Sequence, residues 1–268
     1  GESLNHSFAA SLQTDTPLYR NPAASVDARV DDLLARMTLE EKVAQLMTVW
    51  VEKTEIFDSN LQFDAAKAKQ RYPDGIGQVA RPSDAKGPVS PRELRGRNAR
   101  DTVALVNAVQ RFAVEQTRLG IPVLFHEEAL HGYVAFDATM FPQAIAMASA
   151  WDPDMTRRVN AIAAREARAR GVHIVLSPVV DVARDPRWGR IEETFGEDPF
   201  LIGELASAMV RGYQGGGLED QDAILATAKH FAGYSETQGG RDATEDEKRT
   251  GQAIVAGADV DPSLMRPV

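Results

Sequence analysis

Hydrophobic positions near the start of the chain recur with the spacing of amphipathic helices. This spacing predicts one helix over residues 26–37 and a second helix that begins directly after it. Thr38 and Glu41 stand three residues apart, which is the sequence of a capping box at the start of the second helix. The apolar face of this second helix is expected to comprise Val43, Leu46 and Met47.

Further along, segments with helical spacing alternate with short, unbroken apolar runs. Helices are expected over residues 101–119, 152–170, 199–214 and 246–256, and strands over residues 75–79, 123–125, 173–182 and 223–228. Asp152 followed by Pro153 is a typical helix start, and Gly171 is a typical helix end. Apolar strands separated by helices predict an α/β fold with a parallel sheet that is covered on both faces.

Composition narrows the classes of function. The 268 residues fit one α/β barrel or two smaller domains, and the net charge of −9 argues against nucleic acid or an anionic membrane as partner. No apolar run is long enough to span a bilayer, and the absence of cysteine excludes disulfides but leaves the compartment open. The chain starts with Gly1 and shows no signal-like stretch, so we expect a processed form, and a periplasmic or secreted location is favoured.

Polar side chains gather where two of the expected strands end. Residues 183–190, with three arginines and a tryptophan, follow the strand at 173–182, and Lys229 and His230 follow the strand at 223–228. Ligands of α/β proteins bind at the carboxyl ends of the strands, so the sequence predicts a site for a hydroxyl-rich or anionic molecule.

Each of these groups also has a structural alternative. The residues that could form a salt-bridge knot without any ligand are Arg184, Asp185, Arg187 and Arg190. Lys229 could stand at a solvated strand end, although a lysine after an apolar strand is costly to bury unless it is paired or bound. Both alternatives remain open at this stage.

Glu127 and Glu128 are adjacent carboxylates after the strand at 123–125. Neighbours on an extended chain point to opposite faces, so this pair cannot act as two catalytic carboxylates on one substrate. One is expected to face the mouth of a barrel and the other its shell. Glu128 shares its face with His126.

Two segments resemble known binding motifs but lack the spacing or the flanking elements that those motifs require. His126 and His131 resemble a zinc protease helix, but they are five residues apart and two ligands on one helix face need four. Residues 75–80 imitate a dinucleotide-binding fingerprint, but no strand precedes them and no helix follows. We therefore expect neither a metal nor a cofactor.

Seven stretches of the chain carry a family resemblance. They are residues 37–46, 120–123, 127–132, Ser177-Pro178 with Asp181, 184–190, 193–199 and 228–234. In this order they resemble the barrel domain of glycoside hydrolase family 3, the retaining β-glucosidases and β-xylosidases. The resemblance covers roughly residues 19 to 244 and implies a (β/α)8 TIM barrel.

The resemblance also implies roles for individual residues. Glu128 matches the carboxylate that the family places on the sugar hydroxyls in subsite −1. The further sugar-holding residues would be Arg190, Lys229, His230 and Arg241. A pyranose needs both donors and acceptors, and hydrogen bonds beside the anomeric carbon strengthen in the transition state. The implied substrate is a β-linked oligosaccharide or aryl glycoside with a terminal non-reducing β-D-glucosyl or β-D-xylosyl residue.

The catalytic carboxylates of the family are not identifiable. Its nucleophile is an aspartate in a Ser-Asp-aromatic setting, but the one Ser-Asp here is Ser83-Asp84, followed by Ala85. Residues 247–261 resemble the family's segment after the nucleophile, which indicates an internal deletion near residues 244–246. The second domain, which supplies the acid/base in many members, is also expected to be absent.

The domain organisation follows from these observations. We expect an N-terminal arm over residues 1–18, a shortened barrel over 19–261 and a tail over 262–268. Four good strands and one weak one cannot close an eight-stranded barrel, so the barrel is incomplete. Unpaired edges and exposed apolar surface then favour self-association.

Two functions remain open. The first is a β-glycosidase whose chain is shortened, and the second is a non-catalytic carbohydrate-binding relic or truncated product. An N-acetylglucosaminidase is disfavoured, because that branch carries a histidine in the loop after its Lys-His strand. Here residues 234–238 contain none.

Overall fold

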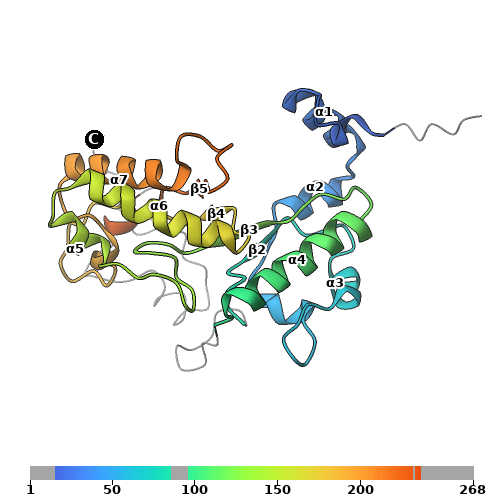
Figure 1. Cartoon of the computed structure of the whole chain (residues 1–268), viewed down its shortest axis with the longest axis horizontal. Coiled ribbons are helices and arrows are strands. Elements are labelled where there is room, and N and C mark those ends of the chain that lie inside the picture. The colour runs from blue at the N-terminus through green and yellow to red at the C-terminus, as the bar shows by residue number, and fades with distance from the viewer. Residues whose placement is uncertain (1–15, 86–95, 232, 237–268) are drawn as a thin grey trace, which may run out of the picture.

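The computed structural model describes residues 16–85, 96–231 and 233–236. Its centre is one parallel sheet of five strands in the order β1-β2-β3-β4-β5 (Figure 1). The strands are β1 Thr48–Val49, β2 Gln78–Ala80, β3 Leu124–Glu127, β4 Ile174–Val175 and β5 Leu225–Ala226. Sequential parallel pairing is the arrangement of a partial TIM barrel, as the sequence predicts.

Helices connect successive strands. The α-helices are α1 Val26–Arg36, α2 Leu39–Gln45, α3 Ala65–Arg71, α4 Ala99–Gln116, α5 Ala144–Ala148, α6 Pro153–Ala169 and α7 Pro199–Gln214. The 3-10 helices are η1 Leu18–Arg20, η2 Val51–Ile56, η4 Ile191–Glu193 and η5 Tyr234–Glu236. The predicted helices over 26–37, 101–119, 152–170 and 199–214 are present with small shifts at their ends. The sequence did not indicate α3 or α5, which are short.

Local capping explains where the predicted helices begin. The capping box of α2 is confirmed, because the Glu41 amide donates to Thr38 Oγ1 at 3.2 Å and the Thr38 amide donates to Glu41 Oε2 at 2.9 Å. Helix α6 begins at Pro153, and the Met155 amide donates to the side chain of Asp152 at 2.9 Å.

Two hydrophobic clusters lie on the helical side of the sheet. One packs α5, α6 and α7 against β4, with Leu205 and Tyr213 fully buried. The other packs α3 and α4 against β1, β2 and β3, with Val109 and Phe125 fully buried. Figure 1 shows α6 with α7 and α3 with α4 at opposite ends of the sheet.

The other face of the sheet is less covered than predicted. Leu124 on β3 is 41% exposed and Leu225 on β5 is 38% exposed. Both point away from the helices, since their neighbours Phe125 and Ile224 are buried. The prediction of cover on both faces is wrong at these positions, because five strands do not enclose the side chains that fill the interior of a complete barrel.

The predicted strands are longer than the observed ladders. In β2 the ladder starts at Gln78 rather than Gly75. Gly77, just before it, lies against α2, where a Cβ atom would be 2.4 Å from the Gln45 carbonyl oxygen. The runs at 173–182 and 223–228 contribute two ladder residues each. The sequence missed β1, which is only two residues long.

The predicted apolar face of α2 is exposed rather than packed. Val43, Leu46 and Met47 are exposed by 48%, 82% and 56%. They adjoin β1, whose one ladder partner within the described residues is β2. An open sheet edge with exposed apolar side chains agrees with an incomplete barrel.

Several predictions fall outside the described residues. These are the helix over 246–256, the junction at 244–246, most of the N-terminal arm, and Arg241. The structure does not test them.

Candidate functional site

The candidate site lies at the carboxyl ends of the strands, where the structure brings together Glu128, Arg190, Lys229 and His230. The Lys229 ammonium donates to Glu128 Oε2 at 3.2 Å. The Arg190 guanidinium donates to the Tyr234 hydroxyl at 3.1 Å, and the ring of Tyr234 lies 4.5 Å from that of His230. The cluster is therefore connected by contacts between distant positions, of which the pair Glu128 and Lys229 is separated by 101 positions.

Glu128 is held between two cations. Its Oε1 accepts from Arg81 at 3.1 Å and its Oε2 accepts from Lys229 at 3.2 Å. The side chains of Glu128 and Lys229 are each 15% exposed. Lys229 is thus paired rather than a solvated strand end, and Glu128 presents a fixed charged acceptor.

His230 is oriented by a buried carboxylate. Its Nδ1 lies 2.8 Å from Asp181 Oδ2, on a side chain that is only 4% exposed. Since a carboxylate accepts, Nδ1 carries the proton and Nε2 remains for a ligand.

Arg190 is fixed by three hydrogen bonds. It donates to both oxygens of Glu193, at 2.7 and 2.5 Å, and to Tyr234. Burial disfavours its charge, yet the bonds to Glu193 and Tyr234 outweigh burial and hold the pKa of Arg190 above its ordinary value. The guanidinium is therefore a permanent, positioned donor.

Two arginines of the possible salt-bridge knot, Arg187 and Arg190, lie in separate pairs. Arg187 pairs with Asp185 at 2.6 Å and is 72% exposed, whereas Arg190 pairs with Glu193 and is 22% exposed. The hydrogen bonds to Asp185 hold its pKa down at about 2. The exposed pair belongs to the surface, and the other faces the cluster.

Glu127 lies on the opposite face from Glu128, as predicted. It is 1% exposed and accepts from the Ser83 amide at 2.9 Å and from the Tyr133 hydroxyl at 3.2 Å. Burial raises the pKa of Glu127 to about 7. The two neighbouring carboxylates do not face one substrate.

Sequence reasoning missed several members of the cluster. Arg81 and Trp50 were not singled out, although each directly follows a strand, and the guanidinium of Arg81 lies 5.3 Å from the Trp50 ring centre. Asp181 and Tyr234 were part of the family motifs but had no role assigned. A search of every strand end for polar side chains would have found Arg81.

The two histidines of the rejected zinc motif have other partners. His126 Nδ1 lies 3.2 Å from Gln78 Oε1, and His131 Nδ1 lies 3.0 Å from the Phe141 carbonyl oxygen. Within the described part of the chain, no group of three possible ligands could hold a metal ion.

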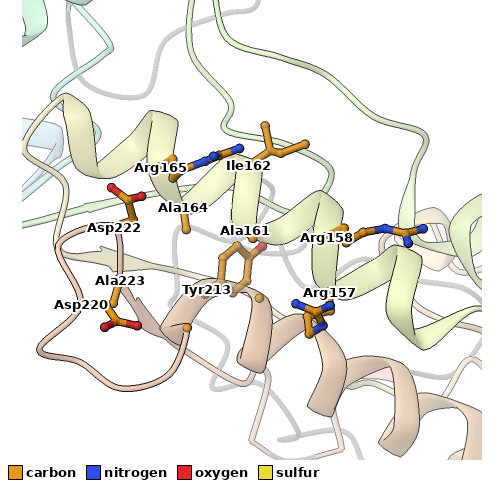
Figure 2. A pocket seen from close by; sticks show the side chains of 12 residues that line it. Arg157, Arg158, Ala161, Ile162, Ala164, Arg165, Tyr213, Asp220, Asp222 and Ala223 are labelled. Carbon is orange, nitrogen blue, oxygen red and sulfur yellow. The ribbon is translucent and has the colours of Figure 1, made fainter.

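A separate groove lies outside the strand ends. It has a volume of about 420 Å³ and lies between α6 and the segment that joins α7 to β5 (Figure 2). Arg157 and Arg165 stand on α6, and Asp220 and Asp222 stand on the connecting segment. None of its lining residues belongs to the cluster around Glu128, so the groove is not part of the candidate site.

Successive βα units with polar side chains converging at the carboxyl ends of the strands define the class of (β/α)-barrel domains. Within that class the chain belongs to glycoside hydrolase family 3, because residues 38–255 match the family model described as "Glycosyl hydrolase family 3 N terminal domain". The family that the motifs resemble is therefore confirmed.

Curated relatives include glycosidases of two kinds. The chain is 34% identical over 238 residues to a putative β-xylosidase of Formosa agariphila, covering 85% of this chain and 29% of that protein. It is 32% identical over 244 residues to a probable β-glucosidase C of Aspergillus oryzae, covering 88% and 36%. The chain thus spans only about a third of the length of these relatives.

Solved structures that resemble the chain include β-glucosidases. A β-glucosidase from Erythrobacter marinus matches with a TM-score of 0.71 and 37% identity, covering 85% of this chain and 28% of that chain. A β-glucosidase from Listeria innocua in complex with glucose matches with a TM-score of 0.64 and 32% identity, covering 81% and 28%.

Proposed function

We propose that this chain carries the sugar-holding half of the active site of a retaining β-glycosidase. The substrates would be oligosaccharides or aryl glycosides with a terminal non-reducing β-D-glucosyl or β-D-xylosyl residue. The observation that carries the proposal is the connected cluster of Glu128, Arg190, Lys229 and His230 at the strand ends. The β-glucosidases and β-xylosidases among the relatives support it.

The cluster has the chemistry that a pyranose requires. Glu128 and the Nε2 atom of His230 offer acceptors to sugar hydroxyls, while Arg190 and Lys229 offer donors, and Arg241 would add another donor. Arg190 and Lys229 are held by their carboxylate partners before the sugar arrives, so little of their conformational entropy is lost on binding. Hydrogen bonds to the hydroxyl beside the anomeric carbon would strengthen as oxocarbenium character develops.

A second candidate is a chain that binds sugar but does not hydrolyse glycosides. Retaining hydrolysis needs two carboxyl groups about 5 Å apart. Glu127 and Glu128 face opposite sides of the strand, and Ser83-Asp84 lies in the turn after β2, with Ser83 buried. No Ser-Asp-aromatic nucleophile is found in the sequence, which favours this alternative.

Release assays with nitrophenyl β-D-glucoside and β-D-xyloside, combined with calorimetric titration of D-glucose and D-xylose, separate the candidates. Turnover well above the blank supports the glycosidase and sinks the second candidate. Binding without turnover supports the second candidate. If the chain shows neither turnover nor sugar binding, both candidate functions are rejected for this chain.

Variants test whether the cluster is the site. Lys229→Met and Glu128→Gln should each weaken sugar binding, because each removes a charged partner of the sugar hydroxyls. Arg187→Met is the matched control, because it removes a cation that is 72% exposed and pairs with Asp185. Equal loss in all three would argue against a specific site.

The location of the protein is also a proposal. We favour the periplasm or secretion, and a periplasmic β-glucosidase of Salmonella typhimurium is 31% identical over 226 residues, covering 81% of this chain and 24% of that protein. The helices of the described residues include none with the length and apolarity of a membrane span. Fractionation of source cells with an antibody against the chain tests the location.

A further inference from the structure

A buried lysine lies beneath the cluster. Lys53 on η2 is fully buried, and its ammonium donates to the Arg81 carbonyl oxygen at 2.6 Å. Burial lowers the pKa of Lys53 to about 8, against the attraction of Asp84 and Glu127. Burying an ammonium group is costly, and the hydrogen bond to the Arg81 carbonyl oxygen offsets part of that cost.

Hydrogen bonds hold both the amide and the carbonyl group of Arg81. Its φ of +45° lies in the left-handed region, which a residue with a side chain rarely adopts. Its amide donates to the His126 carbonyl oxygen at 2.8 Å, and its carbonyl oxygen also accepts from the Asp84 amide at 3.0 Å. Lys53 therefore stabilises a conformation that the chain would otherwise disfavour.

This conformation directs the Arg81 side chain to the site. The guanidinium lies over the Trp50 ring, 5.3 Å from its centre, and donates to Glu128 Oε1 at 3.1 Å. The other oxygen of Glu128 accepts from Lys229. The two cations together fix the plane of the carboxylate, and only one of them belongs to the proposed sugar-holding set.

We propose that Lys53 is a positioning residue of the sugar site, which holds the Arg81 turn and thereby sets the orientation of Glu128. The inference rests on the proposed function, because Glu128 is the group that it prepares for the sugar. Lys53 itself is fully buried and acts only through Arg81.

Sugar affinity gives the first test. In Lys53→Met, the dissociation constant for D-glucose should rise about tenfold, as expected when a partner that orients a binding group is lost. Lys67→Met is the control, because Lys67 also donates to a carbonyl oxygen, that of Phe57 at 2.7 Å, away from the cluster. The double variant Lys53→Met/Glu128→Gln should bind no more weakly than Glu128→Gln alone. Additive losses, or unchanged affinity in Lys53→Met, overturn the inference.

A spectroscopic test does not depend on sugar binding. The three tryptophans are replaced by 5-fluorotryptophan, and the fluorine-19 NMR resonance of residue 50 is assigned with the variant Trp50→Phe. In Lys53→Met this resonance should move toward its position in Arg81→Met, whereas in Lys67→Met it should stay in place. If it stays in place in Lys53→Met, the inference is overturned. If the wild-type chain binds no glucose, the proposed function fails, and this comparison decides the role of Lys53.

A folding control completes the experiment. Lys53→Gln retains a donor and is compared with Lys53→Met by circular dichroism. If both variants lose the folded spectrum, Lys53 is required for folding and a specific positioning role is overturned.

Discussion

Asp181 and His230 lie 2.8 Å apart, Oδ2 to Nδ1, and are contributed by the segments that follow β4 and β5. The aspartate is almost completely buried, whereas the histidine is about a quarter exposed. A carboxylate in this position fixes the imidazole before any ligand arrives. The pair thus joins the segments that follow β4 and β5 at the candidate site.

Asp181→Ala should reduce the affinity for D-glucose about tenfold, because the unrestrained ring of His230 must be ordered on binding. Titration calorimetry measures the change. Asp185→Ala, which removes the carboxylate partner of the exposed Arg187, should leave the affinity unaltered. An equal effect in the two variants would show that His230 does not need Asp181.

Arg190→Lys should weaken glucose binding about tenfold or more. A lysine cannot keep two parallel bonds to Glu193 and also reach the Tyr234 hydroxyl. The same titration measures the loss, and Arg187→Lys is the control at the exposed pair. Retained affinity in Arg190→Lys would mean that charge alone suffices at this position.

Glu127 predicts a specific dependence of stability on pH. Burial raises its pKa from 4.5 to about 7, so between these values the native state binds more protons than the unfolded state. The contribution of Glu127 to the free energy of unfolding is fully present below pH 4.5 and is lost as the pH rises through 7. Glu127→Gln keeps an acceptor for Ser83 and Tyr133 and removes this loss, which is at most about 3 kcal/mol.

The thermal midpoints of wild type and Glu127→Gln, measured from pH 4.5 to pH 8, test this dependence. The advantage of the variant should grow as the pH rises. A constant difference across the range would contradict the raised pKa.

Thr38→Ala should lower the free energy of unfolding by about 1 kcal/mol, because it removes one half of the capping box of α2. Urea unfolding followed by circular dichroism measures the change. Ser25→Ala removes the cap of α1, a helix with no buried residue, and should have a smaller effect. A larger effect at Ser25 would mean that α1 contributes more to stability than its exposure indicates.

The exposed apolar residues directly after α2 predict self-association. Leu46→Glu combined with Met47→Glu should shift the chain toward monomer in sedimentation velocity experiments, since both side chains are more than half exposed beside an open sheet edge. Leu218→Glu, at a residue 56% exposed after α7, is the control. A concentration-independent monomer in the wild type would refute the prediction.

The parts of the structure that could be predicted depend on local interactions. Helix starts at Thr38 and Asp152 follow from capping, which involves residues three apart. The opposite orientations of Glu127 and Glu128 follow from the geometry of an extended chain. Four of the five predicted site residues come together because strand ends of a parallel sheet share one edge. Their role in holding a sugar stays a prediction.

The remaining parts depend on contacts between distant segments. The lengths of β1, β4 and β5 are set by which neighbours pair, and two-residue ladders leave no periodicity to detect. The role of Arg81 depends on Lys53 and Glu128, which lie 28 and 47 residues away. The exposure of Val43 depends on which strands adjoin β1 in space, and hydrophobicity alone does not show this.

The two hydrophobic clusters adjoin at the β3–β4 ladder, where His126 pairs with Ile174 and Glu127 with Val175. We expect the two clusters to behave as two foldons that share this ladder as a seam. The Glu127 carboxyl group spans this seam, because it accepts from Ser83 after β2 on one side and from Tyr133 in the α6–α7 cluster on the other. Both donors bind the same oxygen, Oε1, so one buried carboxyl group joins the two halves of the sheet.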